Sequence, residues 1–313
     1  MRRMTADDPF ALERRRVGAA FDAASERYDA AAKIQHAVRA ELLERLLELR
    51  LEPRTILDLG AGTGTGARDL KRRFPKSLVV ATDLAPAMLR VAAKRSSWLR
   101  PFGRVAADAY RLPFRNQSFD LIFSNLMFQW CDDLVTPFKE ARRVLKPSGR
   151  FLMSTFGPDT LTELRQSWAA AGDGANHVSR FLDLHDVGDA LLRAGFVEPV
   201  LDVDRVVLQH KLALDLMREL KTIGARNATQ GRSRGLTTRR RLDAVVAAYE
   251  THRRNGKLPA TYEVVYASAW GNESAPVGIA DRGPEVRIDA HSIRHRSRSP
   301  VDDEAGTGRG PAA

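Results

Sequence analysis

Residues 58–66 read Asp-Leu-Gly-Ala-Gly-Thr-Gly-Thr-Gly and lie between a short apolar run, RTILDLG (54–60), and a helical pattern, GARDLKRRF (66–74). Glycines in such a loop let the backbone turn tightly and approach a ligand closely. In open α/β sheets, ligands bind at the carboxyl ends of the strands, where the strand order reverses. We therefore expect this loop to hold a ligand at the end of the first strand.

Strands and helices alternate on both sides of the loop. Apolar runs predict strands at 54–60, 77–84, 103–108, 118–125, 150–155, 200–209 and 261–270. Helical spacing predicts helices within 11–50 and at 66–74, 86–95, 133–145, 185–195, 212–224 and 237–254. This alternation indicates an α/β fold with a seven-stranded, mostly parallel, doubly wound sheet that is Rossmann-like.

The composition is that of a globular protein, with 43% hydrophobic and 28% charged residues among 313 and a net charge of +11. One cysteine, Cys131, excludes an intramolecular disulfide framework and a multi-cysteine zinc site. His177 and His185 lack an obvious third ligand, so we expect no metal site. No apolar run is long enough to span a membrane, and the charged N-terminus does not resemble a signal peptide. We therefore expect a soluble cytoplasmic protein.

The glycine loop alone leaves two ligand classes open. Gly62, Gly64 and Ala67 fit the dinucleotide pattern G-x-G-x-x-A, and Asp83 follows about 20 residues later, so an NAD-dependent dehydrogenase is one reading. Acids at three successive strand ends favour S-adenosylmethionine instead. Asp58 suits its amino group, Asp83 its ribose hydroxyls, and Asp108 with the following Ala109 its adenine amino group.

This series of acids and glycines resembles the class I S-adenosylmethionine-dependent methyltransferases. LPFRNQSFDLIFSN (112–125) and LKPSGRF (145–151) are also similar to stretches of that family. The resemblance implies S-adenosylmethionine as the cofactor. It implies these cofactor-binding residues: Asp58, Gly60, Gly62, Gly64, Asp83, Leu84, Asp108 and Ala109.

Further segments resemble one subgroup, the malonyl-acyl-carrier-protein O-methyltransferases of biotin synthesis (BioC type). They span roughly residues 14–270 and are RVGAAFDAASERYDAAAKIQ (16–35), NLMFQW (125–130), FGPDTLTELRQSW (156–168), HVSRFLDLHDVGDALLRAGF (177–196), LMRELKTIGARNATQGRSRGLTTRRRL (216–242) and LPATYEVVYASAW (258–270). The resemblance implies methyl transfer to the free carboxylate of a malonyl thioester, on acyl carrier protein or coenzyme A. The ester would then prime pimeloyl synthesis. An arginine hydroxylase of respiratory complex I assembly, which shares some of these stretches, is the alternative.

On this reading the chain divides into four parts. Residues 1–50 would form an N-terminal helical lid, and 51–157 the Rossmann-like core that binds the cofactor. Residues 158–271 would add substrate lid helices and the closing strands of the same sheet. Residues 272–313 contain few large apolar side chains, so we expect a disordered tail.

The chemistry needs no strong general base, because a malonyl carboxylate is already ionised at neutral pH. We expect catalysis by positioning, with Tyr28, Asn125 and Gln129 as the catalytic candidates. The carboxylate also needs a binding group. Arg180, Lys221 and Arg226 are the substrate-binding candidates, and Arg180 is favoured because a guanidinium fork suits a carboxylate.

The segment from Lys221 to Lys257 is strongly basic, with ten Lys or Arg residues and two acids. It would steer an acidic acyl carrier protein toward the substrate site. Nucleic acid is the competing partner, but the segment lacks interleaved aromatic residues and no separate RNA-binding module is evident. We therefore expect a carrier-protein surface. The sequence leaves the oligomeric state open.

Overall fold

The computed structural model describes residues 14–172, 181–225 and 238–272. All of them belong to one compact unit, Met1–Pro276. The lid, the core and the closing strands expected from the sequence are therefore parts of one unit. The expected tail at 272–313 lies outside the described residues except for its first residue.

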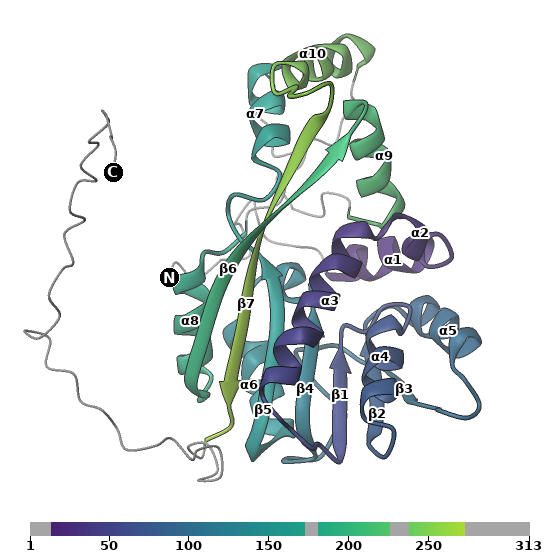
Figure 1. Ribbon diagram of the computed structural model, residues 1–313, viewed down its shortest axis with the longest axis vertical. Coiled ribbons are helices and arrows are strands. Elements are labelled where there is room, and N and C mark those ends of the chain that lie inside the picture. The colour runs from purple at the N-terminus through teal and green to yellow at the C-terminus, as the bar shows by residue number, and fades with distance from the viewer. Residues whose placement is uncertain (1–13, 173–180, 226–237, 273–313) are drawn as a thin grey trace, which may run out of the picture. The chain divides into compact units, whose positions relative to one another are not determined.

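Seven strands form a single sheet in the order β3-β2-β1-β4-β5-β7-β6 (Figure 1). The strands are β1 (Thr55–Leu59), β2 (Leu78–Asp83), β3 (Gly103–Ala106), β4 (Phe119–Asn125), β5 (Leu145–Phe156), β6 (Val197–His210) and β7 (Leu258–Trp270). Strands β1 to β5 are parallel, and β7 runs antiparallel to both of its neighbours, β5 and β6. This topology confirms the predicted fold class. The strand order reverses between β1 and β4, which is where a ligand is expected.

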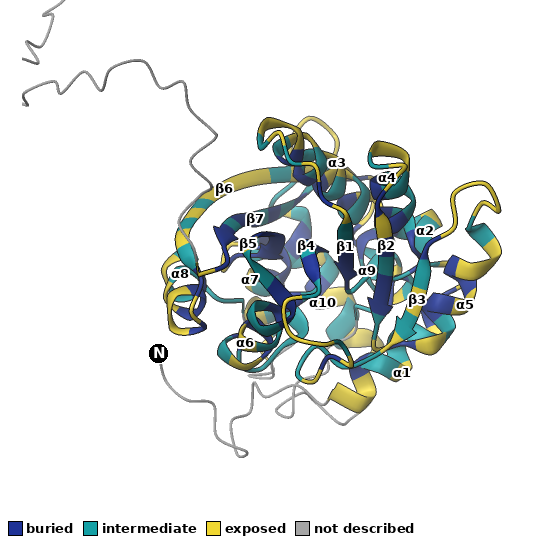
Figure 2. Ribbon diagram, turned by 90° about the horizontal axis from the view of Figure 1, so that it is seen from below, coloured by how far each residue is buried: buried dark blue, intermediate teal, exposed yellow. Residues whose placement is uncertain are grey.

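Helices cover both faces of the sheet (Figure 2). The described helices are α1 (Arg14–Ala24), α2 (Tyr28–Ala31), α3 (Lys33–Glu48), α4 (Thr65–Arg73), α5 (Pro86–Arg95), η1 (Phe128–Trp130), α6 (Val135–Val144), α7 (Thr162–Ala170), α8 (Leu184–Arg193), α9 (Ala213–Thr222) and α10 (Arg239–Glu250). Ile56 of β1 packs in the cluster with α3, α4 and α5, whereas the next residue, Leu57, packs with α6 and α8. This alternation is why the central strands read as continuous apolar runs.

The last two strands are longer than the sequence predicts. β6 and β7 extend beyond the parallel strands toward α7, α9 and α10 (Figure 1). The alternation of exposed and less exposed residues along β6 ends with the buried His210. The antiparallel pair of β6 and β7 thus reaches α7 and α9, which lie beyond the parallel strands.

Three details differ from the expectations. α7 was not anticipated, because its buried residues include Glu163 and Ser167 and its sequence lacks a strong apolar period. β5 begins at Leu145, since Pro147, Ser148 and Gly149 lie within the strand instead of in a turn before it. α3 is part of the core and not a lid, because its buried face packs on β4 and β5. Within the described ranges, no helix is long and apolar enough to cross a membrane.

Candidate active site

A cavity of about 790 Å³, including its mouth, lies where β1, β2 and β4 end. We call it cavity A. Its lining is Arg14, Val17, Phe21, Tyr28, Leu59, Gly60, Gly62, Thr82, Asp83, Leu84, Met88, Ala107, Asp108, Ala109, Tyr110, Asn125, Leu126, Met127, Trp130 and Cys131. The structure thus brings most of the predicted cofactor residues to one cavity.

The glycine loop forms one wall of cavity A and needs its glycines for two reasons. Gly60, Gly62 and Gly64 have φ values of +77°, +53° and +74°, a region that favours glycine. A Cβ atom at Gly60 would also overlap the side chain of Met127, whereas one at Gly62 would meet nothing within 4 Å. Gly62 therefore leaves open space on the cavity side, and Gly60 allows close packing behind it.

Asp83 holds the loop in place and retains capacity for a ligand. Its Oδ2 accepts a hydrogen bond from the Gly62 N–H at 2.8 Å, and its Oδ1 accepts one from the Ala85 N–H at 2.8 Å. Burial raises the pKa of this carboxyl despite those two bonds. Each oxygen keeps a second lone pair, so two neighbouring hydroxyl donors would satisfy it.

Asp108 lies two residues beyond the end of β3, at the opposite side of cavity A. Its Oδ1 accepts from the Tyr110 N–H at 3.0 Å, and its Oδ2 accepts from Nη1 of Arg14 at 3.1 Å. The Arg14 guanidinium also lies 4.5 Å from the centre of the Tyr110 ring. The start of α1 therefore closes this end of the cavity over Asp108.

Asp58 lies beneath the glycine loop and is not among the residues that line cavity A. It is 2% exposed, and within the described part of the chain its Oδ2 accepts no hydrogen bond. A Cβ atom at Gly66 would lie 2.9 Å from that oxygen, so the carboxylate faces the start of α4. Burial raises the pKa of Asp58 to about 7, and the nearby acids Asp83 and Asp69 act in the same direction.

These residues fit S-adenosylmethionine. Two polar atoms beside the loop, Oδ2 of Asp58 and Oγ1 of Thr82, are buried without a partner among the described residues. Such atoms are costly unless a ligand or water satisfies them. The carboxylate of Asp83 suits a ribose diol, and Asp58 places negative charge beneath a cationic ligand. Asp83, Leu84, Asp108 and Ala109 all line the cavity, as expected.

Helices α1 and α2 lie over cavity A, and two residues of α1 contact elements of the core. Oδ1 of Asp22 accepts from the Ala87 N–H at 2.7 Å, which ties α1 to the first turn of α5. Phe21 packs edge-on against Trp130, with ring centroids 5.2 Å apart. Both contacts join a residue of the N-terminal segment to an element of the core.

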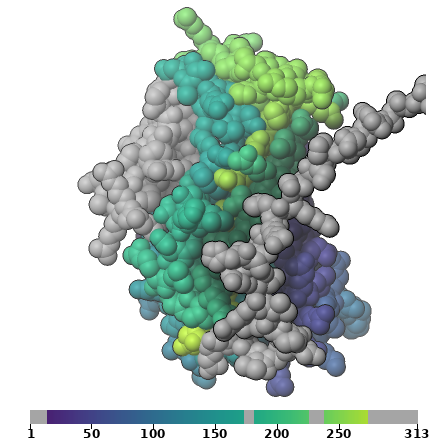
Figure 3. Space-filling view, turned by 60° about the vertical axis from the view of Figure 1, so that its left-hand side comes forward, coloured from purple at the N-terminus to yellow at the C-terminus, as the bar shows by residue number. Residues whose placement is uncertain are grey.

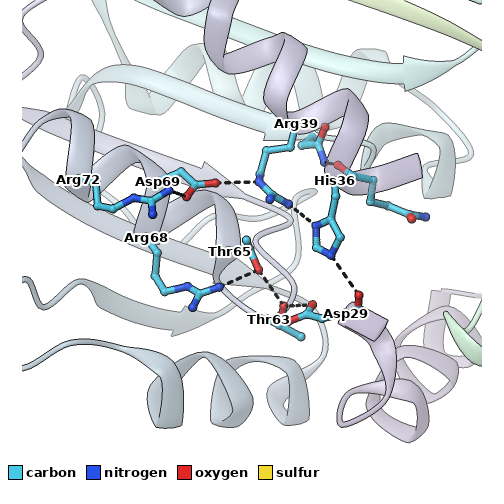
Figure 4. A network of polar contacts seen from close by, with 10 residues as sticks. Asp29, His36, Arg39, Thr63, Thr65, Arg68, Asp69 and Arg72 are labelled. Atoms are coloured by element: carbon cyan, nitrogen blue, oxygen red, sulfur yellow. Dashed lines mark hydrogen bonds and ion pairs between the residues drawn. The ribbon is translucent and has the colours of Figure 1, made fainter. Parts of the chain in front are cut away.

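A polar network joins α2 and α3 to the glycine loop and α4 (Figure 4). Oγ1 of the buried Thr63 donates to Oδ1 of Asp29 at 2.6 Å, and the backbone oxygen of Asp29 lies 3.1 Å from Nε2 of His36. Arg39 then contacts Nδ1 of His36 at 2.8 Å and Oδ2 of Asp69 at 2.9 Å. Burial and the adjacent Arg39 lower the pKa of His36, so the neutral ring donates through Nε2. The conformation of α2 is therefore coupled to that of the loop.

A second cavity, cavity B, adjoins cavity A and has a volume of about 730 Å³ with its mouth. Its lining is Phe21, Tyr28, Ile34, Gln35, Leu126, Gln129, Trp130, Phe156, Thr160, Leu161, Leu164, Phe181, Leu220, Ile223, Ala225 and Tyr262. The set is mostly apolar, and no described side chain in it is ionised at neutral pH. Phe21, Tyr28, Leu126 and Trp130 line both cavities.

The three catalytic candidates lie at or near this junction. Tyr28 lines both cavities, and burial with the nearby Asp83 raises its pKa, so its hydroxyl stays protonated. Asn125 lines cavity A, donates from Nδ2 to the backbone oxygen of Gln35 at 3.1 Å and accepts from Ser154. Gln129 lines cavity B and donates from Nε2 to the backbone oxygen of Leu126 at 2.6 Å.

The substrate-binding candidates are not brought together. Arg180 and Arg226 lie outside the described residues, as does His177. Lys221 is exposed on α9 and does not line either cavity. Cys131 lines cavity A, and burial raises the pKa of its thiol to about 12. Within the described ranges, no cluster of three or more His, Cys, Asp or Glu side chains is placed to hold a metal ion.

Several cavity residues were not anticipated. Arg14, Phe21 and Gln35 come from the N-terminal helices, and Thr160 and Tyr262 from distant segments. The resemblance to the methyltransferase subgroup covers the segment 16–35 as a whole and does not distinguish its individual residues. Only the fold shows which of its side chains reach a cavity, because helical spacing does not distinguish a core face from a ligand face.

Known proteins resemble this chain in sequence and in fold. Residues 57–153 match the family model "Methyltransferase domain". A malonyl-acyl-carrier-protein O-methyltransferase from Halorhodospira halophila is 50% identical over 94% of this chain and 100% of its own length. One from a Methylovorus strain is 49% identical over 89% of this chain and 95% of its own length. The YcgJ protein of Bacillus subtilis has a similar fold, with a TM-score of 0.55 at 17% identity, covering 75% of this chain and 100% of its own.

Proposed function

The chain belongs to the malonyl-acyl-carrier-protein O-methyltransferase family, and we propose that it methylates the free carboxylate of a malonyl thioester. One observation carries this proposal: a cavity edged by the glycine loop and acids meets a mostly apolar cavity at Phe21, Tyr28, Leu126 and Trp130. Methyl transfer needs two ligands to meet end to end. The junction of cavities A and B supplies such a place.

In this proposal S-adenosylmethionine, when bound, supplies an electrophilic methyl group that becomes bonded to a carboxylate oxygen while the bonding electron pair stays with sulfur. The residues of the chain position the reactants. Asp83 and Asp108 would hold the nucleoside end, and the glycine loop with Asp58 would hold the amino-acid end. Tyr28, Asn125 and Gln129 shape the junction.

The reaction needs no proton transfer by the protein. A malonyl carboxylate is ionised at neutral pH, and no proton leaves on methyl transfer. The rate gain then comes from alignment and from exclusion of water, for which correct orientation can supply about 7–11 kcal/mol. A cavity lined by Phe156, Leu161 and Leu164 suits this purpose, because it removes solvent from the attacking oxygen.

The thioester carrier would be an acidic acyl carrier protein that docks on α9 and α10. Arg239 and Arg240 are exposed on α10, and Lys221 is exposed on α9. Arg254 and Lys257 are exposed in the segment between α10 and β7. Leu220 of α9 lines cavity B, so this helix separates the cavity from the basic surface. In Figure 3 the yellow-green surface of α10 lies beside the teal surface of α7 at the upper end of the unit. Arg180 and Arg226 stay predictions, because both lie outside the described residues.

The product would prime pimeloyl synthesis in the making of biotin, in the cytoplasm. This part of the proposal follows the family and the resemblance noted in the sequence. Complementation of a biotin auxotroph that lacks the methylation step tests it in the cell.

The direct test uses purified protein and S-adenosylmethionine labelled in its methyl group. Malonyl-acyl carrier protein should acquire a base-labile labelled ester, and acetyl-acyl carrier protein, which has no free carboxylate, should not. A malonyl carrier that stays unlabelled would overturn the proposal. Hydroxylation of an arginine in that case would favour the alternative hydroxylase.

A further inference from the structure

The first turn of α3 borders cavity B and carries an amide that the protein itself does not satisfy. Ile34 and Gln35 both line this cavity. Oε1 of Gln35 is inaccessible to solvent and has no hydrogen-bond partner among the described residues. Buried amide atoms are almost always paired, so this unpaired oxygen shows that contacts among the described residues do not fix the orientation of the amide.

The same turn is the positive end of a long helix. α3 has 16 residues, and Ala32, which precedes it, has no side-chain atom that can cap its free N–H groups. The aligned peptide dipoles favour negative charge at this end. A helix terminus alone would not define a site, but here it coincides with the unpaired amide of Gln35 in one cavity wall.

Two other polar side chains of the cavity, Gln129 and Thr160, are already engaged within the protein. Gln129 donates from Nε2 to the backbone oxygen of Leu126 at 2.6 Å. Thr160 donates to the backbone oxygen of Glu263 at 3.0 Å. The backbone of Gln35 is fixed by Asn125, whose Nδ2 donates to the Gln35 backbone oxygen at 3.1 Å. The side chain of Gln35 remains available.

We propose that the side-chain amide of Gln35 holds and orients the malonyl carboxylate. Gln35 lines the cavity, and its amide nitrogen would donate to one carboxylate oxygen and leave the other to accept the methyl group. This inference rests on the proposed function and names the residue that confers selectivity for a free carboxylate.

A neutral donor also suits the chemistry better than a cation would. A guanidinium paired closely with the carboxylate would stabilise its charge and weaken it as a nucleophile. One amide N–H and the positive end of α3 orient the group with less charge neutralisation. The apolar remainder of cavity B keeps the carboxylate poorly solvated.

The test compares Gln35→Leu with Gln166→Leu, the same change at an exposed position on α7. Gln35→Leu should lower kcat/KM for malonyl-acyl carrier protein by roughly 10- to 100-fold, the usual effect of losing a hydrogen bond to a charged group. Binding of S-adenosylhomocysteine, measured by calorimetry, should not change. Gln166→Leu should retain wild-type activity.

Gln35→Glu gives a readout that a purely structural role would not produce. At pH 8 the introduced carboxylate repels the substrate carboxylate, so activity should fall below that of Gln35→Leu. As the pH falls to 6, the introduced acid takes up a proton, because burial raises its pKa, and it then donates a hydrogen bond. Its activity relative to wild type should therefore rise as the pH falls.

Three outcomes would overturn the inference: undiminished kcat/KM in Gln35→Leu, an equal loss in cofactor binding, or a flat pH ratio for Gln35→Glu. Each of these can be seen only if the wild-type protein forms the malonyl methyl ester. A wild-type protein that forms no ester refutes the proposed function itself, and the role of Gln35 falls with it.

Discussion

The buried Asp58 should make the cofactor-free protein less stable as the pH rises, and Asp58→Asn should remove that dependence. The pKa of the carboxyl is raised from 3.8 to about 7 in the folded protein, mainly by burial. The folded state therefore binds the proton more tightly than the unfolded chain does. The stability associated with this group is fully present below pH 3.8, falls as the pH rises toward 7, and is constant above it.

The magnitude follows from that difference. At about 1.4 kcal/mol for each tenfold change in proton affinity, ionising Asp58 costs the folded protein about 4 kcal/mol more than the unfolded chain. Between pH 5 and pH 8, about 2–3 kcal/mol of that cost develops. The difference in unfolding free energy between Asp58→Asn and wild type should therefore grow by this amount over the interval, in favour of the variant.

Urea unfolding followed by tryptophan fluorescence measures the difference at several pH values without cofactor. Any constant effect of the substitution on packing cancels, because only the change with pH is compared. A difference that stays constant between pH 5 and pH 8 would refute the reasoning. The same variant should bind S-adenosylhomocysteine roughly 10- to 100-fold more weakly at pH 8, since a charged acceptor beneath the loop is lost.

Three further predictions concern the loop, the network and the basic surface. Gly60→Ala should lower the melting temperature of the cofactor-free protein markedly, because its Cβ would overlap Met127, whereas Gly62→Ala should cost only about 1–2 kcal/mol of backbone strain and should instead weaken cofactor binding, because its Cβ would enter the open space left for the ligand; equal losses of stability in the two variants would contradict this. Thr63→Val removes the hydrogen bond to Asp29 and should speed hydrogen exchange in residues 14–31 while raising KM for the cofactor; unchanged exchange would argue against the coupling. Arg239→Glu with Arg240→Glu should reduce kcat/KM for malonyl-acyl carrier protein at least about tenfold at low salt, with little effect on malonyl-coenzyme A and a smaller one at high salt; equal loss on both thioesters would exclude a docking role.

The central sheet could be predicted from the sequence because its strands are buried on both faces. Their apolar runs, each followed by a turn and an amphipathic helix, leave little ambiguity. α7 could not be predicted in this way. Its buried Glu163 is stabilised by the N–H of Thr261 at 3.1 Å, a contact between residues nearly a hundred positions apart. A helix held by a polar tertiary contact has no local apolar period to reveal it.

The cofactor side of the site was predictable for a related reason. Parallel strands place their carboxyl ends at one edge, so acids at or near the ends of β1, β2 and β3 must lie near one another. The substrate side is built from α2, α3, η1, α7, α9 and β7, which meet only in the folded protein. Gln35 shows the difference, because nothing in its local sequence distinguishes it from a solvated helix residue. Its role depends on cavity B, which several distant segments form together.

The two cavities are linked by more than a shared wall. Thr63 in the glycine loop binds Asp29, and Asp29 directly follows Tyr28, which lines both cavities. A loop that is fixed by cofactor would therefore fix α2, and with it the tyrosine at the junction. Asn125 links the end of β4 to the backbone of Gln35 in the same way. From these contacts we expect the cofactor to bind first and the malonyl group to enter afterwards, an order that initial-rate kinetics would test.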